Sequence, residues 1–281
     1  MCDTCGCNIT PGNRHLLAAP LGRSNLGQTP EKILGSLLQH NDRQEANRAR
    51  LDGHGVLTVN LMSSPGSGKT ALLESTIRQL NGGLRLAVIE GDLETENDAD
   101  RIRALGIPAY QITTGTACHL DAHLVAKALD KLDLTHLDVL FIENVGNLVC
   151  PASFDLGHHR NVTLLSVTEG DDKPAKYPVM FRAADLMLIS KTDILPYLPE
   201  FSPQRAEDCL RNLASKVPAL RLSSKSGEGM DEWISWLQDE VASYRVARQT
   251  QQTLVPRLQP EGRLLHHAGP EIRFVPVKHA G

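Results

Sequence analysis

One segment restricts the possible folds of this chain more than any other. An apolar run at residues 56–62 is followed directly by SSPGSGKT at residues 63–70, and Lys69 opens a helical pattern that ends near Leu80. A strand, a glycine-rich loop ending in Lys-Thr and a helix, in this order, are typical of a phosphate-binding loop. Ser63 stands where the usual motif has a glycine, which is compatible with the loop if its φ angle is negative.

The residue types of this loop predict its chemistry. Gly66 and Gly68 let the backbone N–H groups around Ser67 curl round a phosphate, and the N-terminus of the following helix adds its dipole. Lys69 is expected to reach the β- and γ-phosphates of a nucleotide, and the Thr70 hydroxyl to bind Mg²⁺. The sequence therefore predicts a nucleotide site here.

The pattern on the C-terminal side of this loop extends the fold prediction. Apolar runs alternate with helical patterns, and Val, Ile and Leu dominate the runs without polar alternation, as expected of parallel strands covered on both faces. Strand–helix alternation of this kind predicts an α/β fold, a mostly parallel sheet covered by helices. We expect strands at residues 56–62, 85–89, 138–142, 162–167 and 186–189.

Two acidic residues follow predicted strands. Asp92 comes shortly after the run 85–89, and Glu143 directly after the run 138–142. Open α/β sheets bind ligands at the carboxyl ends of their strands, and phosphoryl transfer needs acidic groups that hold the metal and orient water. We expect Asp92 to bind Mg²⁺ together with Thr70, although ordinary strand-terminal acids remain the alternative. The expected catalytic residues are Lys69, Asp92 and Glu143.

Other polar residues near these strands are weaker candidates. Asp98 and Asp100 fit the acidic first turn of a helix as well as a site. No arginine finger or glutamine stands in a recognisable motif near the acidic residues, which predicts slow hydrolysis by the isolated protein.

The segment that follows the run 186–189 bears on the choice of base. Lys191 and Asp193 belong to a Ser-Lys-Thr-Asp sequence at the place where GTP-binding proteins carry Asn-Lys-x-Asp. The carboxylate of such an aspartate accepts two hydrogen bonds from guanine, a donor pair that adenine lacks. Ser224 and Lys225, after a further strand, are expected to offer backbone contacts to the base oxygen. The order and spacing of these motifs favour GTP over ATP.

Three cysteines crowd the start of the chain. Cys2, Cys5 and Cys7 provide three thiolates, and the N-terminal amine would provide a fourth ligand. This set suits square-planar Ni²⁺, although the same thiolates would take Zn²⁺ tetrahedrally. A disulfide is the alternative, but it is disfavoured in a reducing compartment.

The 281 residues divide into four parts on these patterns. Residues 1–29 predict a flexible nickel-binding arm, 30–55 a helix and linker, 56–245 the nucleotide-binding domain and 246–281 a poorly ordered tail rich in Gln, Pro, Arg and His. The pairs His158-His159 and His266-His267 lack helical ligand spacing, so we expect them at the surface.

Composition excludes several classes of protein. A net charge of −4 leaves no electrostatic footprint for nucleic acid or an anionic membrane. No apolar run reaches the roughly 20 residues that span a bilayer, and no secretory signal is recognisable. Six cysteines, three of them at one end, favour thiols in the cytoplasm over a disulfide scaffold.

Together these motifs resemble a known family. The phosphate loop, the Glu-Asn-Val-Gly sequence that begins at Glu143 and the Ser-Lys-Thr-Asp sequence are similar to those of dimerising GTPases. The resemblance is greatest to the HypB family, nickel-insertion GTPases of [NiFe]-hydrogenase maturation, over residues 56–244 and, separately, residues 1–7. It implies a phosphate-loop GTPase with GTP, Mg²⁺ and Ni²⁺ as ligands, a GTP-dependent homodimer, and other maturation factors and the hydrogenase large-subunit precursor as partners.

The same resemblance changes the reading of three further residues. From the sequence alone, Cys118 reads as a small buried side chain and His119 as a helix cap. The HypB resemblance instead implies that Cys118, His119 and Cys150 form a second site, for nickel or zinc, near the dimer interface. Because Cys150 lies four residues after Gly146, a change of nucleotide would then alter the ligand geometry.

Two other functions stay open at this point. A nickel reservoir with a vestigial nucleotide site would need no intact Lys69, Thr70 and Asp193. A related GTPase that serves urease or a cobalamin enzyme would not be expected to carry the cysteine cluster at residues 2–7.

Overall fold

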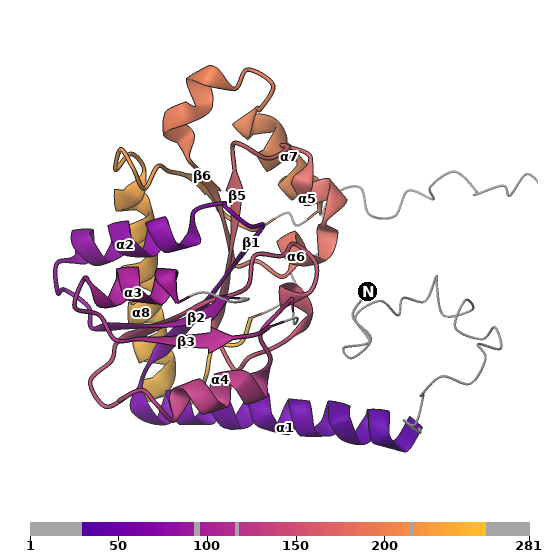
Figure 1. Ribbon diagram of the computed structural model, residues 1–281, viewed down its shortest axis with the longest axis vertical. Coiled ribbons are helices and arrows are strands. Elements are labelled where there is room, and N and C mark those ends of the chain that lie inside the picture. Colours follow the sequence, from indigo (N-terminus) through magenta and orange to yellow (C-terminus); the bar gives the residue numbers. More distant parts are fainter. Residues whose placement is uncertain (1–29, 93–95, 116–117, 214–215, 257–281) are drawn as a thin grey trace, which may run out of the picture.

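A single parallel sheet organises the molecule (Figure 1). The computed structural model describes residues 30–92, 96–115, 118–213 and 216–256, with side chains from residue 42 onward. The seven strands follow the order β3-β2-β4-β1-β5-β6-β7, and every pair is parallel. The strands are β1 Leu57–Ser63, β2 Leu86–Asp92, β3 Ala109–Thr113, β4 Val139–Glu143, β5 Arg160–Ser166, β6 Leu186–Ser190 and β7 Ala219–Arg221.

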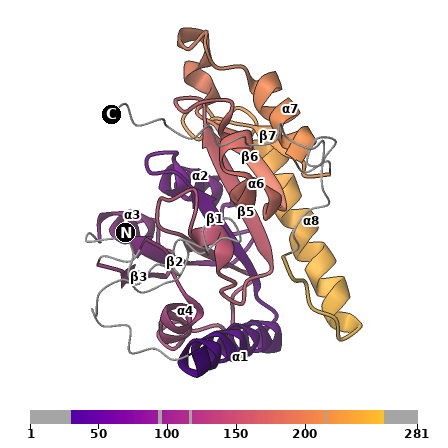
Figure 2. The same ribbon diagram turned by 90° about the vertical axis from the view of Figure 1, so that its right-hand side faces the viewer.

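Helices cover both faces of this sheet (Figures 1 and 2). Helices α2, α3 and α8 pack on one face around Phe141 and Trp233, while α1, α4, α6 and α7 cover the other. The α-helices are α1 Pro30–His54, α2 Lys69–Leu80, α3 Asn97–Arg103, α4 Ala122–Leu129, α5 Lys173–Lys176, α6 Pro178–Arg182, α7 Pro203–Leu213 and α8 Met230–Gln249. Two short 3-10 helices, η2 Pro151–Ser153 and η3 Thr192–Tyr197, complete the elements used below.

The predicted α/β fold is confirmed, and each of the five predicted strands overlaps an observed one. Edge strand β3 was not predicted, because Tyr110 and Gln111 are half-buried and its apolar signal is weak. No described helix is long and apolar enough to cross a membrane.

Helices α1 and α8 lie at the two ends of the described chain. Helix α1 ends at His54, and packing does not require a glycine at position 53, because a Cβ there would meet no neighbour within 4 Å. Helix α8 continues to Gln249, past residue 245, and Leu254 beyond it packs against the core.

The prediction for His158 and His159 is wrong, because both side chains are buried. His158 Nε2 lies 2.7 Å from Asn161 Oδ1, and its Nδ1 accepts a hydrogen bond from the Leu156 amide. His159 Nδ1 accepts from the Thr58 amide. The sequence did not reveal this burial, because segments that cover the pair are distant in the chain: Thr58 of β1 bonds His159, and Arg48 of α1 donates to the His158 carbonyl. The pair His266-His267 lies outside the described residues.

Candidate functional site

The phosphate-binding loop lies between the carboxyl end of β1 and the start of α2. Gly66 and Gly68 have φ angles of 73° and 99°, in the left-handed region that favours glycine. Ser63 ends β1 without a positive φ, so the serine fits where a glycine is usual. Its hydroxyl accepts a hydrogen bond from Lys69 Nζ at 3.1 Å, which holds the lysine over the loop.

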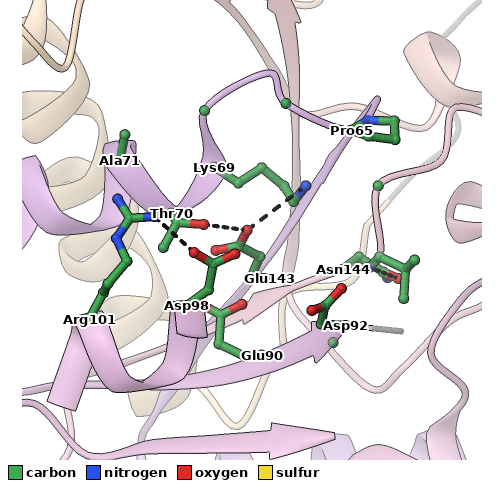
Figure 3. Close-up of a pocket in the computed structure, with 15 residues that line it drawn as sticks. Pro65, Lys69, Thr70, Ala71, Glu90, Asp92, Asp98, Arg101, Glu143 and Asn144 are labelled. Atoms are coloured by element: carbon green, nitrogen blue, oxygen red, sulfur yellow. Dashed lines mark hydrogen bonds and ion pairs between the residues drawn. The ribbon is translucent and has the colours of Figure 1, made fainter. Parts of the chain in front are cut away.

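A cavity of about 370 Å³ opens beside this loop (Figure 3). Its wall includes Gly66, Gly68, Lys69 and Thr70 from the loop, with Ser67 buried behind them. The opposite wall comes from the carboxyl ends of β2 and β4, since these strands and β1 are neighbours in the sheet. The predicted residues Asp92 and Glu143 both line the cavity.

Glu143 is the buried acid of this cavity. Its Oε1 accepts a hydrogen bond from the Thr70 hydroxyl at 3.0 Å and lies 3.9 Å from Lys69 Nζ. Its Oε2 is buried and has no hydrogen-bond partner. Burial raises the pKa of this carboxyl, and the charge of Lys69 partly opposes the rise. A buried hydroxyl next to an unpaired carboxylate oxygen suits a hard cation such as Mg²⁺.

Glu90 joins Glu143 and was missed in the sequence. The two residues are register partners on β2 and β4, and Glu90 is buried with Oε1 unpaired. Burial, together with repulsion from Glu143, raises the pKa of Glu90 well above its ordinary value. The available signal was an acidic residue inside an otherwise apolar strand. Asp92, at the end of the same strand, was the more obvious candidate.

Asp98 also lines the cavity, beside Arg101 of the same helix (Figure 3). Arg101 Nη1 donates to Asp98 at 2.8 Å, and its other nitrogens donate to Glu74 on α2. The sequence pattern indicates Asp98 only weakly, and it does not indicate Arg101. Asp100, by contrast, is exposed and pairs with Arg103, so it belongs to the outer face of the helix.

The predicted base-recognition residues come together after β6 and β7. Lys191 takes a left-handed conformation, with a φ angle of 62°, and its Nζ donates to the Gly66 carbonyl at 2.6 Å. Ser190, where the usual motif has asparagine, donates instead to the Ser67 carbonyl. Asp193 accepts from Ser223, and both segments therefore meet at one end of the phosphate loop.

The turn that contains Ser224 and Lys225 follows β7. Ser223 Oγ accepts hydrogen bonds from the backbone amides of Lys225 and Ser226, at 3.2 and 3.1 Å. Because the same hydroxyl donates to Asp193, the turn and the aspartate are held as one unit.

A cluster of possible metal ligands lies next to the loop that leaves β4. Cys118 Sγ is 3.2 Å from Cys150 Sγ and 3.7 Å from His119 Nδ1, and the three ligand atoms lie within 4.8 Å of one another. The two cysteines are not joined by a disulfide. The His119 ring stacks on the Phe154 ring, with 3.9 Å between the ring centroids. It does not cap α4, because Asp121 is the N-cap of that helix.

This donor set fits a soft or borderline metal. Two thiolates and one imidazole are ligands that Ni²⁺ and Zn²⁺ both accept, and three protein ligands leave a position open for exchange. The cysteines are partly exposed while His119 is buried, so the cluster is accessible from one side. Cys2, Cys5 and Cys7 lie outside the described residues.

Comparisons with known proteins identify the family of the chain. Residues 57–220 match the family described as CobW/HypB/UreG, nucleotide-binding domain. The chain is 53% identical to the hydrogenase maturation factor HypB of Escherichia coli K12, over 82% of this chain and 80% of the relative. It is similar to the crystal structure of HypB from Helicobacter pylori in complex with nickel, with 38% identity, a TM-score of 0.70, and coverage of 76% of this chain and 97% of that one. The structure of HypB from Archaeoglobus fulgidus is similar as well, with 37% identity and a TM-score of 0.68 over 73% of this chain and 99% of that one.

Proposed function

The chain belongs to the HypB family of hydrogenase maturation factors, and on that premise we propose that it is a GTPase that carries nickel and delivers it to a [NiFe]-hydrogenase precursor. One observation carries the proposal: the Cys118-His119-Cys150 cluster adjoins the loop that runs from Glu143 in the nucleotide pocket to Cys150. One segment, residues 143–150, thus connects the proposed nucleotide site with the proposed metal site.

The nucleotide half of the proposal assigns a role to each residue of the pocket. Gly66, Ser67 and Gly68 hold the phosphates with their backbone amides, and Lys69 neutralises their charge. Thr70 and Asp92 would bind Mg²⁺, whose role when bound is to neutralise charge on the transferred phosphate. Glu143 accepts from Thr70 and keeps that hydroxyl in place.

Guanine recognition rests on the base end of the site. Asp193 would accept the two guanine donors, with Lys191 lying over the phosphate loop. The turn at Ser224 and Lys225 would contact the base oxygen. Adenine would leave the Asp193 carboxylate without hydrogen-bond donors, so ATP should bind less tightly than GTP.

The metal half treats nickel as cargo. We assign Cys118, His119 and Cys150 to a nickel site that Zn²⁺ would also occupy, and Cys2, Cys5 and Cys7 to a separate nickel site on the N-terminal arm. The proposal further includes a cytoplasmic location, a GTP-dependent homodimer, and contacts with other maturation factors and the hydrogenase precursor. The shared segment favours this function over a nickel reservoir, which would need no coupling to nucleotide.

Equilibrium dialysis with ⁶³Ni, run beside GTP turnover, tests the proposal. Deleting residues 1–7 should remove one nickel equivalent and spare turnover, and Cys118→Ala in the deleted chain should remove the remaining one. Cys209→Ala, a half-buried cysteine on α7, is the matched control and should change neither. A parent protein that binds no nickel, or that hydrolyses no GTP, would refute the function.

A further inference from the structure

One asparagine lies between the two ligand loops of the metal cluster. Asn147 Nδ2 donates to the Cys118 carbonyl at 3.3 Å, and its Oδ1 accepts from the Val149 amide at 2.8 Å, immediately before Cys150. A single side-chain amide therefore bonds the backbone of Cys118 and the turn that precedes Cys150. This contact joins segments about thirty residues apart, and an amide with a donor and an acceptor group suits it.

The backbone of the same segment is fixed to the phosphate loop. The Asn147 amide donates to the Ser63 carbonyl at 2.8 Å, and the Asn144 amide donates to the Leu61 carbonyl. Between them, Gly146 packs so closely that a Cβ there would lie 2.8 Å from Pro65 Cα. Gly146 and Pro65 are in direct contact, so a displacement of the phosphate loop or of the segment after β4 moves the other.

A second asparagine connects the ligand loop to the core. Asn144 lines the nucleotide cavity, and its Oδ1 accepts from the Leu120 amide at 3.3 Å. Its Nδ2 donates to Asn60 on β1, and Asn60 in turn donates to Asn161 on β5. All three asparagines are buried, so leaving any of these hydrogen bonds unmade would destabilise the fold. These hydrogen bonds attach the ligand loop at Leu120 to strands β1 and β5 of the sheet.

We propose that Asn147, supported by Asn144, is the positioning residue that couples nucleotide state to metal affinity at the Cys118-His119-Cys150 cluster. This inference rests on the proposed function. Nucleotide phosphates act on the segment that starts at Glu143, and that segment holds the Cys118 carbonyl and the turn before Cys150 through one amide. A shift of the segment therefore changes the separation of the two thiolates, to which a metal is sensitive.

The test uses the full-length chain with Cys2, Cys5 and Cys7 replaced by alanine, so that the measured nickel binding comes from the Cys118-His119-Cys150 cluster. Nickel affinity is measured by competition with a chelator, in GDP and in a non-hydrolysable GTP analogue. Coupling between ligand sites usually lies at about 5- to 150-fold, and we expect the parent ratio in that range. In Asn147→Ala the ratio should fall toward one.

Two further variants separate positioning from folding. Asn147→Asp keeps the acceptor for the Val149 amide but loses the donor to Cys118, so its ratio should fall as well. Ser153→Ala, which removes an exposed hydroxyl three residues after Cys150, should keep the parent ratio. GDP affinity of the metal-free protein should be unchanged in every variant, which shows that the fold is intact.

The outcomes distinguish the two proposals. Nickel binding with equal affinity in both nucleotide states, or a parent-like ratio in Asn147→Ala, would overturn the coupling and leave the nickel site standing. A parent that binds no nickel at this cluster would overturn the proposed function, and the inference with it.

Discussion

Two groups of buried ionisable side chains lie in this molecule, and they are built differently. The acid pair, Glu90 and Glu143, lines the nucleotide cavity, and each carboxyl has a buried oxygen without a hydrogen-bond partner. The histidine region consists of the buried His158, His159 and Asp52 with the half-buried Asp155, and it joins α1 to the segment that precedes β5. There both ring nitrogens of His158 have partners, and Asp52 accepts from Tyr244 at 2.8 Å.

The difference separates a ligand site from a structural one. A buried carboxyl oxygen without a hydrogen-bond partner is costly, so it persists where a bound cation completes it. A buried histidine with both nitrogens bonded needs no ligand and instead links elements. In the histidine region Arg48 of α1 pairs with Asp155 at 2.7 Å, and Tyr244 of α8 bonds Asp52 of α1. Substitutions in the cavity should therefore change activity, and substitutions in the histidine region stability.

The largest effect should come from Lys69→Ala. Without the lysine, charge on the phosphates loses its nearest cation, and we expect GTP turnover to fall by about 10²–10³-fold. The midpoint of thermal unfolding should change little, since the lysine serves the ligand. Steady-state phosphate release measures this, with Lys216→Ala, an exposed lysine, as control. Turnover equal to that of the parent would remove Lys69 from the chemistry.

Asp193→Asn should have the next largest effect. Its amide offers one acceptor in place of two, so GTP affinity should fall by on the order of 10²-fold while ATP affinity stays low. Competition binding of both nucleotides gives the ratio. Asp239→Asn, at an exposed site of α8, is the control. If the parent itself binds ATP as tightly as GTP, the guanine assignment is wrong.

Tyr244→Phe tests the other side of the comparison. Loss of the hydroxyl leaves Asp52 without one donor, and the free energy of unfolding should fall by about 1–3 kcal/mol. GTP turnover should be that of the parent. Urea denaturation measures the loss, and Tyr197→Phe, with its side chain 81% exposed, should be neutral. A loss of turnover without a loss of stability would contradict the structural role.

The two groups should also respond to pH in opposite directions, with the smallest effects. Burial lowers the pKa of His158 from 6.5 to about 4. The unfolded chain therefore takes up a proton that the folded chain refuses, and stability falls as pH drops from 6.5 toward 4. Asp52 adds to this loss: burial alone would raise its pKa, but hydrogen bonds from His159 and Tyr244 hold it below the ordinary value.

The acid pair has the opposite sign. Because the pKa of Glu90 is raised by burial and by Glu143, the folded protein keeps a proton that the unfolded chain loses above about pH 4.5. Nucleotide-free protein should therefore lose stability as pH rises, and Glu90→Gln should reduce that slope without changing the acid limb. His158→Gln should reduce the slope of the acid limb and leave the other limb unchanged. Urea denaturation between pH 4 and 8 measures both slopes, and an unchanged alkaline limb in Glu90→Gln would reject the assignment of Glu90.

The sequence by itself determined the parts of this protein whose geometry is local. Gly66, Gly68 and Lys69 are neighbours in the chain, and a strand before them and a helix after them are enough to shape the loop. The acids Asp92 and Glu143 were found because parallel strands all place their carboxyl ends at one edge of the sheet. In these cases position along the chain already implies position in space.

The tertiary structure decided what depends on contacts between distant segments. Cys118 and Cys150 meet at 3.2 Å only because two loops converge beyond β4, and without the family resemblance their sequence pattern favoured simple packing. Glu90 became a site residue only when strand register placed it opposite Glu143. His159 proved to be buried, because Thr58 of β1 and Asp52 of α1, both distant in the chain, pack against it. A chain's local pattern encodes backbone conformation, whereas burial and partnership of side chains arise only when the elements pack.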